Sequence, residues 1–221
     1  AKIADNAVEN EHLNANVITG HTALGATPAD TDELLVSDAG TLKRVDFSYL
    51  KGGGMFELIS TTTVSSGVSS VDFTSLSSDF DDFLVSASQF NIETDGEIIR
   101  ARAYIGGSLI TSSKYQYLAR GYESSELTVR QNAGTEWRFG ENIGNAGGEC
   151  ASFEFIIFGV HDTSHNKSYL SQFVGQDTST EVMYAGGGGN IDLTGAITGL
   201  SFFQSGGNII SGKFSLYGRK R

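Results

Sequence analysis

The sequence predicts an all-β protein, in which an extended N-terminal arm with one β-hairpin module precedes a C-terminal antiparallel β-sandwich of jelly-roll-like type. Three observations support this fold class. Apolar and polar residues alternate with a period of two along most of residues 56–221. Turn-forming Gly, Asn and Asp residues recur between the alternating runs. No stretch of that region keeps the apolar spacing of an amphipathic helix over ten residues.

The arm comprises residues 1–50 and is poor in large side chains, with Phe47 and Tyr49 as its only aromatic residues. Such a segment lacks the apolar bulk to build a core alone. Residues 33–38 should form a short strand, residues 39–41 its turn and residues 42–47 the return strand. Because an isolated two-stranded hairpin is marginal in water, we expect copies of the chain or a partner surface to cover it.

Five apolar residues of this hairpin are the expected attachment surface for other subunits or for a partner. They are Leu34, Val36, Leu42, Val45 and Phe47. Burying one Val or Leu side chain contributes roughly 1.5–3 kcal/mol. These positions therefore offset the entropy of ordering the hairpin only if most of them are covered.

Residues 51–55 form a glycine-rich joint, because three consecutive glycines have little reason to hold one geometry. The sandwich domain then spans residues 56–221. Its expected strands are at residues 57–63, 69–74, 83–90, 97–105, 114–120, 126–131, 151–158, 168–174, 179–184, 196–203 and 209–217. Roughly ten strands are too many for one stable open sheet and stack readily as two. The run Gly186–Gly189 is expected to be a loop, and it lacks the Lys-Ser or Lys-Thr of a phosphate-binding loop.

Two of these strands have a clear facial pattern. In one strand the apolar face is expected to hold Ile99, Ala101, Ala103 and Ile105. In the last strand the corresponding face is expected to hold Ile210, Gly212, Phe214 and Leu216.

The charge balance and the motifs present argue against several classes of function. The net charge is −11, so nucleic acid and anionic membranes are unlikely partners, and no apolar stretch is long enough to span a bilayer. His161 and His165 fall in a polar loop without the glutamate of a zinc protease motif. An axial metal site at His12 or His21 of a trimer is the one metal hypothesis left open. We expect no cofactor.

Catalysis is not expected either. No Gly-x-Ser-x-Gly motif occurs. Carboxylates for glycoside cleavage could come from Asp79, Asp81 and Asp82 or from Glu123 and Glu126, but their separation does not follow from the sequence.

A group of aromatic and amide residues in the middle of the sandwich is the candidate recognition surface. The group comprises Tyr115, Tyr117, Tyr122, Trp137 and Asn142. Tyr and Trp combine a large apolar face with a polar tip, which suits carbohydrate or protein surfaces. The alternative is that Tyr115 and Tyr117 are ordinary strand residues and that Trp137 belongs to the core.

Several segments resemble those of tailed-bacteriophage fibres and related virion proteins. Residues 4–8 and 13–18 repeat an apolar and Asn/Ala cadence, residues 32–50 resemble intertwined β-modules, and residues 212–218 are similar to the last strand of small sandwich tips. The resemblance implies a homotrimer whose arms wind together or dock onto other virion proteins through residues 1–50. It also implies a location in the virion.

The resemblance leaves the function open between classes. A non-enzymatic tail fibre or fibre tip would bind a glycan or protein of the host surface through the sandwich. A capsid decoration or head-fibre protein would clamp the shell instead. A glycan-degrading tailspike is the remaining alternative, and it lacks a recognisable catalytic constellation.

Overall fold

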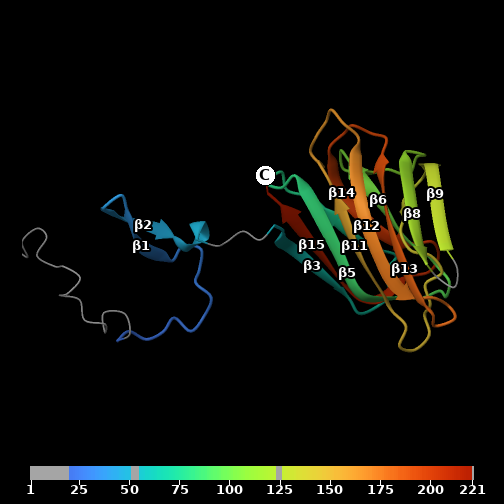
Figure 1. The fold of residues 1–221 in the computed structure, drawn as a ribbon, viewed down its shortest axis with the longest axis horizontal. Helices are drawn as coiled ribbons and strands as arrows, with labels where there is room; N and C mark the ends of the chain where they lie inside the picture. The colour runs from blue at the N-terminus through green and yellow to red at the C-terminus, as the bar shows by residue number, and fades with distance from the viewer. Residues whose placement is uncertain (1–19, 51–54, 123–125, 221) are drawn as a thin grey trace, which may run out of the picture. The chain divides into compact units, whose positions relative to one another are not determined.

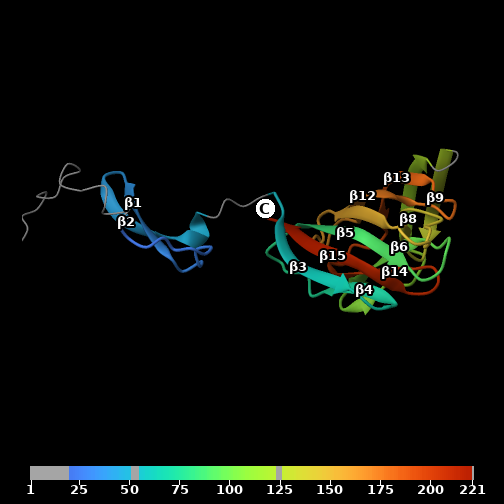
Figure 2. The same cartoon turned by 90° about the horizontal axis from the view of Figure 1, so that it is seen from below.

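The computed structural model describes residues 20–50, 55–122 and 126–220. The chain divides into two compact units, Ala1–Gly53 and Gly54–Arg221, and the division falls within the glycine-rich joint expected at residues 51–55. All regular elements of the described residues are strands except one short 3₁₀ turn, so the protein is all-β (Figures 1 and 2). The repeat expected in residues 3–18 lies outside the described residues.

The first unit contains one antiparallel hairpin, formed by β1 (Glu33–Asp38) and β2 (Thr41–Asp46) and followed by the 3₁₀ turn η2 (Phe47–Tyr49). Ala39 and Gly40 form the two-residue loop with φ of 49° and 84°. Positive φ at both positions is the requirement of a type I′ turn, which matches the twist of the paired strands. The hairpin expected from the sequence is therefore present.

The second unit is built from two antiparallel sheets. The larger has eight strands in the order β3 (Glu57–Val64), β15 (Ile209–Arg219), β5 (Asp82–Ile92), β11 (Ala151–Ile157), β12 (Lys167–Gln176), β13 (Val182–Ile191), β8 (Tyr115–Tyr122) and β9 (Glu126–Gly134). The smaller has five strands, β10 (Trp137–Arg138), β6 (Ile99–Ile105), β14 (Ile197–Gln204) and β4 (Ser70–Thr74), with β7 (Ser108–Leu109) paired to β6. Figure 1 views the larger sheet with β3 and β9 at its two edges.

Aromatic rings from both sheets form the core. Phe153 of β11 stacks on Phe202 of β14 with ring centroids 5.4 Å apart, and Phe155 meets the same ring edge-on at 5.7 Å. Such pairs add roughly 0.5–1.5 kcal/mol to the stabilisation from burial alone. The sheets therefore face one another through their apolar sides, as in a β-sandwich.

The facial pattern of β6 is confirmed, because Ile99, Ala101 and Ala103 are buried and Ile105 packs against the core. The pattern expected for β15 is wrong at its start, where Ile209 is buried and Ile210 is exposed. Register irregularities against β5 on both sides of Ser211 insert extra residues and reverse the facing of the side chains.

The glycine run is not a loop, which corrects the expectation from the sequence. Gly186–Gly189 lie inside β13, hydrogen-bonded between β12 and β8. A Cβ at Gly187 would lie 2.5 Å from the carbonyl oxygen of Leu118, and one at Gly189 would overlap that of Gln116. Glycine is therefore required at these two positions by the close approach of the β8 backbone.

Candidate recognition surface

Three of the five residues expected on the recognition surface are in the core. Tyr115, Tyr117 and Trp137 are buried. Tyr115 and Tyr117 point inward from β8, because the alternation of a strand places them on the face opposite Gln116 and Leu118. These three residues are therefore packing groups, which corrects the surface role expected for them.

The polar tips of Tyr115 and Trp137 have partners inside the fold. The Tyr115 hydroxyl donates to the carbonyl of Ile110 at 2.8 Å and accepts from the amide of Ala103 at 3.0 Å. Burial raises the pKa of Tyr115 to about 12. Trp137 donates from Nε1 to the carbonyl of Asn190 at 3.0 Å. Neither side chain has a group left over for an external ligand.

The other two expected residues differ from one another. Tyr122 is 64% exposed, as a recognition residue should be. Asn142 is half-buried in the segment between β10 and β11, where its φ of 50° places it in the left-handed region. Asn tolerates that conformation better than most residues, so a turn role accounts for it.

A strip without side chains runs along β13 on the outer face of the eight-stranded sheet, and we call it the glycine trough. Gly186 and Gly188 form its floor, since the alternating residues Met183 and Ala185 are buried on the other face. Cross-strand neighbours form its walls, namely Gln172 and Leu170 from β12 and Arg120 and Leu118 from β8.

Polar side chains mark the two ends of the glycine trough. Tyr184 is 48% exposed, and its hydroxyl lies 3.1 Å from the position that a Cβ at Gly186 would take, so its side chain extends along the trough. Asn190 lies at the other end, and its Oδ1 is buried without a hydrogen-bond partner among the described residues. That oxygen is closed off from solvent, so it does not face the open surface of the trough.

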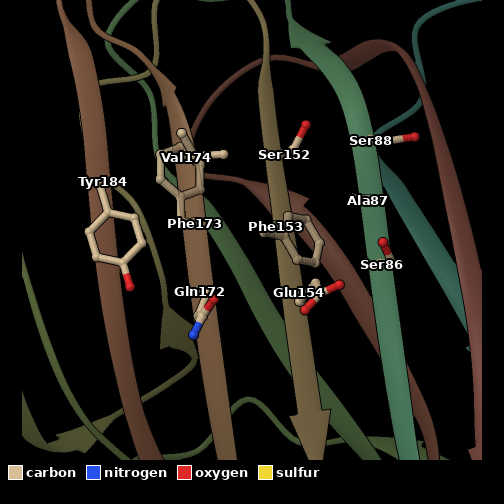
Figure 3. A pocket seen from close by; sticks show the side chains of 10 residues that line it. All are labelled: Ser86, Ala87, Ser88, Ser152, Phe153, Glu154, Gln172, Phe173, Val174 and Tyr184. Atoms are coloured by element: carbon tan, nitrogen blue, oxygen red, sulfur yellow. The ribbon is translucent and has the colours of Figure 1, made fainter. Parts of the chain in front are cut away.

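Two hollows adjoin the glycine trough. The hollow beside Tyr184 has a volume of about 280 Å³, and Figure 3 shows Tyr184, Gln172 and Glu154 on successive strands along it. The hollow beside Gly188 has a volume of about 450 Å³ and includes Arg120 and Arg130 in its lining. Together they make an open, mixed polar and apolar surface.

The charges around the glycine trough are uneven. No ion pair joins Arg120 or Arg130 to a carboxylate in the described part of the chain. Glu154 lies two strands away from β13, beyond Gln172. The β8 side of the trough is thus locally cationic in a chain of net charge −11.

The outer face of the smaller sheet carries a paired cluster instead. Glu136 is buried, and its carboxylate oxygens accept from Arg100 and Arg102 at 3.1 Å each. Burial alone would raise the pKa of Glu136, but hydrogen bonds from Thr135 and Arg102 and the two cationic charges hold it below its ordinary value. The carboxylate of Glu136 is thus fully paired, and the cluster serves the stability of the sheet.

The five hairpin residues expected to form the attachment surface split into two groups. Leu34, Val36 and Leu42 are 44%, 36% and 73% exposed, whereas Val45 and Phe47 are half-buried. Within the described residues, the hairpin thus leaves most of its apolar side chains open to solvent.

Residues that could support metal binding or catalysis are dispersed or already paired. No group of three or more His, Cys, Asp or Glu residues that could hold a metal ion occurs in residues 20–50, 55–122 and 126–220. His21 is exposed, and His12 and Glu123 lie outside the described residues. Asp82 accepts from Arg219 and from the amide of Gly159. No helix of the described residues is long and apolar enough to cross a membrane.

Comparison with known proteins gives no match to a family model, to a curated protein or to a solved structure.

The sequence contained one signal for the glycine trough. Met183, Ala185 and Ile191 lie at even spacing on both sides of the glycines, which is the period of a strand that continues through them. The sequence does not show that Tyr184 and Gln172 lie on the outer face of the sheet, because the face that each side chain occupies depends on the register of three strands.

Proposed function

We propose that the chain is a non-enzymatic virion structural protein, a trimeric tail fibre or fibre tip. Residues 1–50 attach it to other virion proteins, and the sandwich contacts a host surface. The observation that carries this proposal is the hairpin, whose two strands are paired along their whole length but which has no core of its own among residues 20–50. The sandwich, by contrast, buries a complete core within one chain.

Both faces of the hairpin are apolar, which narrows what can cover it. Leu34 lies opposite Val45 on one face, and Leu35 and Leu42 lie on the other. A single flat partner surface would cover only one of these faces. Intertwining with two further copies covers both, and closed symmetry is the usual form of such assemblies.

The two sheet orders favour a jelly roll as the architecture of the sandwich. One sheet contains the path β3-β15-β5-β11, and the other contains the path β4-β14-β6-β10. In both paths an early strand of the domain, β3 or β4, is the neighbour of a late one, β15 or β14. Two four-stranded sheets built from two Greek keys have this arrangement. The hairpin β12-β13 and the strands β8 and β9 then extend the first sheet as additions.

A capsid decoration protein is the second candidate, and one surface favours it. The edge strand β3 exposes Leu58 and Ile59, and a hollow of about 330 Å³ lies between it and β4. An edge strand presents unpaired backbone groups that can pair with another chain. A neighbouring capsid subunit would provide that cover.

Two measurements test the proposal. Light scattering of the full-length protein should give the mass of a trimer, and a monomer mass would contradict it. A protein lacking residues 1–50 should still bind host cells, while the same deletion abolishes incorporation into virions. If the full-length protein binds empty capsids and not host cells, the decoration function replaces the fibre function.

A further inference from the structure

We propose that the glycine trough binds an acidic saccharide chain. This inference rests on the proposed function and deepens it, because it names the class of surface molecule that the sandwich would contact.

The fold does not require glycine at residue 186, in contrast to residues 187 and 189, where the β8 backbone approaches closely. The atoms nearest to a Cβ at Gly186 would be those of the Tyr184 side chain. Glycine in a strand interior is less stable than alanine by roughly 0.5–1 kcal/mol. A larger side chain at residue 186 would displace the Tyr184 ring, so the glycine there lets this ring lie along the trough beside Gln172 and Arg120.

The walls have the chemistry of carbohydrate recognition. A saccharide presents apolar C–H faces and a rim of hydroxyl groups, so it requires an exposed ring beside donors and acceptors. Tyr184 supplies the ring, and the exposed Gln172 supplies an amide group beside Gly186. The hollow beside Tyr184 adds the carboxylate of Glu154.

A peptide is a poorer fit to the same place. An extended peptide gains its affinity by adding a strand to a free sheet edge. β13 is hydrogen-bonded to β12 over its whole length and to β8 from Tyr184 to Ile191, so the trough has no free backbone groups to offer. A ligand must be recognised there through side chains and stacking.

The charge selects an acidic chain. Arg120 and Arg130 line the hollow beside Gly188 without a carboxylate partner among the described residues. Guanidinium groups bind carboxylates in a bidentate manner. The negative charge of the rest of the chain is screened over about 8 Å at physiological ionic strength, so the local arginines dominate contact with a ligand.

The test is calorimetric titration of the full-length protein with acidic oligosaccharides. Oligogalacturonate, oligomannuronate, hyaluronan fragments and oligo-N-acetylneuraminate serve as probes, with a neutral β-glucan of equal length for comparison. At least one acidic probe should bind, at least tenfold more tightly than the neutral glucan, and more weakly as salt is added. Binding of none of the acidic probes, or equal binding of the neutral glucan, would overturn the proposal.

Three variants locate the site. Gly186→Val should weaken binding more than tenfold while the thermal unfolding midpoint stays level or rises, and Arg120→Gln should weaken binding and reduce its salt dependence. Gly147→Val is the matched control, because a Cβ there meets nothing within 4 Å, and it should bind as the unmodified protein does. Binding that survives Gly186→Val would overturn the proposal.

The trimer measurement keeps this test separate from that of the function. If the protein is a trimer that binds host cells but no acidic saccharide, only the saccharide assignment fails. If it is a monomer that binds an acidic saccharide through the glycine trough, the fibre function fails and the saccharide assignment stands.

Discussion

The hairpin and the sandwich are made from the same kind of strand but differ in what covers them. Leu34 and Val45 face one another across β1 and β2 much as Phe153 and Phe173 do across β11 and β12. Phe153 is then buried by Phe202 of the opposite sheet, whereas no second layer within residues 20–50 covers Leu34, which remains 44% exposed. Alternation in a sequence thus specifies a strand and its apolar face. The layer that covers this face must come from another sheet or from another chain.

The strongest way to break this comparison is to place one charge on each of the two apolar faces of the hairpin. The double variant Leu34→Asp/Leu42→Asp should abolish the trimer, because each lost burial costs roughly 1.5–3 kcal/mol and the new charges resist desolvation. The unfolding midpoint of the sandwich should not change. Light scattering measures the first effect and calorimetry the second. The double variant Leu34→Val/Leu42→Val keeps both positions apolar, so it is the control and should leave the trimer intact.

The reciprocal experiment removes the second layer of the sandwich. Phe202→Ala should lower the free energy of unfolding by about 3–5 kcal/mol, because a buried ring that contacts Phe153, Phe155 and Phe139 is replaced by a cavity. Urea denaturation measures this cost. Phe203→Ala is the control, since Phe203 is only half-buried, and it should cost much less. Equal costs at the two positions would contradict the two-layer core.

A smaller effect tests whether the outer face of the smaller sheet depends on its ion cluster. Glu136→Gln should cost about 2 kcal/mol at neutral pH, since Arg100 and Arg102 lose a charged acceptor. Because the pKa of Glu136 lies below its ordinary value of 4.5 in the folded protein, its contribution is present above that value. The difference between the two proteins should therefore shrink as pH falls below about 4. Urea denaturation at several pH values measures it, and a constant difference would contradict the role of the charge.

The smallest expected effect comes from comparing two neighbouring glycines of β13, Gly186 and Gly187. Gly186→Ala should leave stability unchanged or raise it by up to about 1 kcal/mol, because alanine loses less entropy than glycine in a strand. Gly187→Ala should instead destabilise the fold by about 1–3 kcal/mol, since its Cβ would press on the β8 backbone. Thermal unfolding of the pair measures both, and equal costs would show that Gly186 is structural.

Most of the fold could be predicted from the sequence, because apolar and polar residues alternate with a period of two wherever the strands are long. The hairpin, the joint and the strands of both sheets follow from alternation and turn residues. The two-residue strand β10, Trp137–Arg138, is too short to show a period. The path of β13 through Gly186–Gly189 was missed because glycine was interpreted as a turn signal, whereas here it serves close backbone approach.

The candidate site was harder to predict, because it depends on which face of a strand each side chain occupies. Tyr115 and Tyr117 were expected outside and lie inside, while Leu118, the residue after Tyr117, lies outside. A strand of the larger sheet with apolar residues on both faces gives no sequence signal that separates inside from outside. Only the pairing of β8 with β13 settles it.

The pairing of β3 with β15 has a consequence for engineering. Glu57, at the start of the first strand of the sandwich, pairs with Gly218 near the end of the last. Entry to and exit from the domain are therefore neighbours, so a short linker between them should permit circular permutation, with new ends opened at the surface turn Gly106–Gly107. The same proximity would let the sandwich be inserted as a cassette into a surface loop of an unrelated host protein.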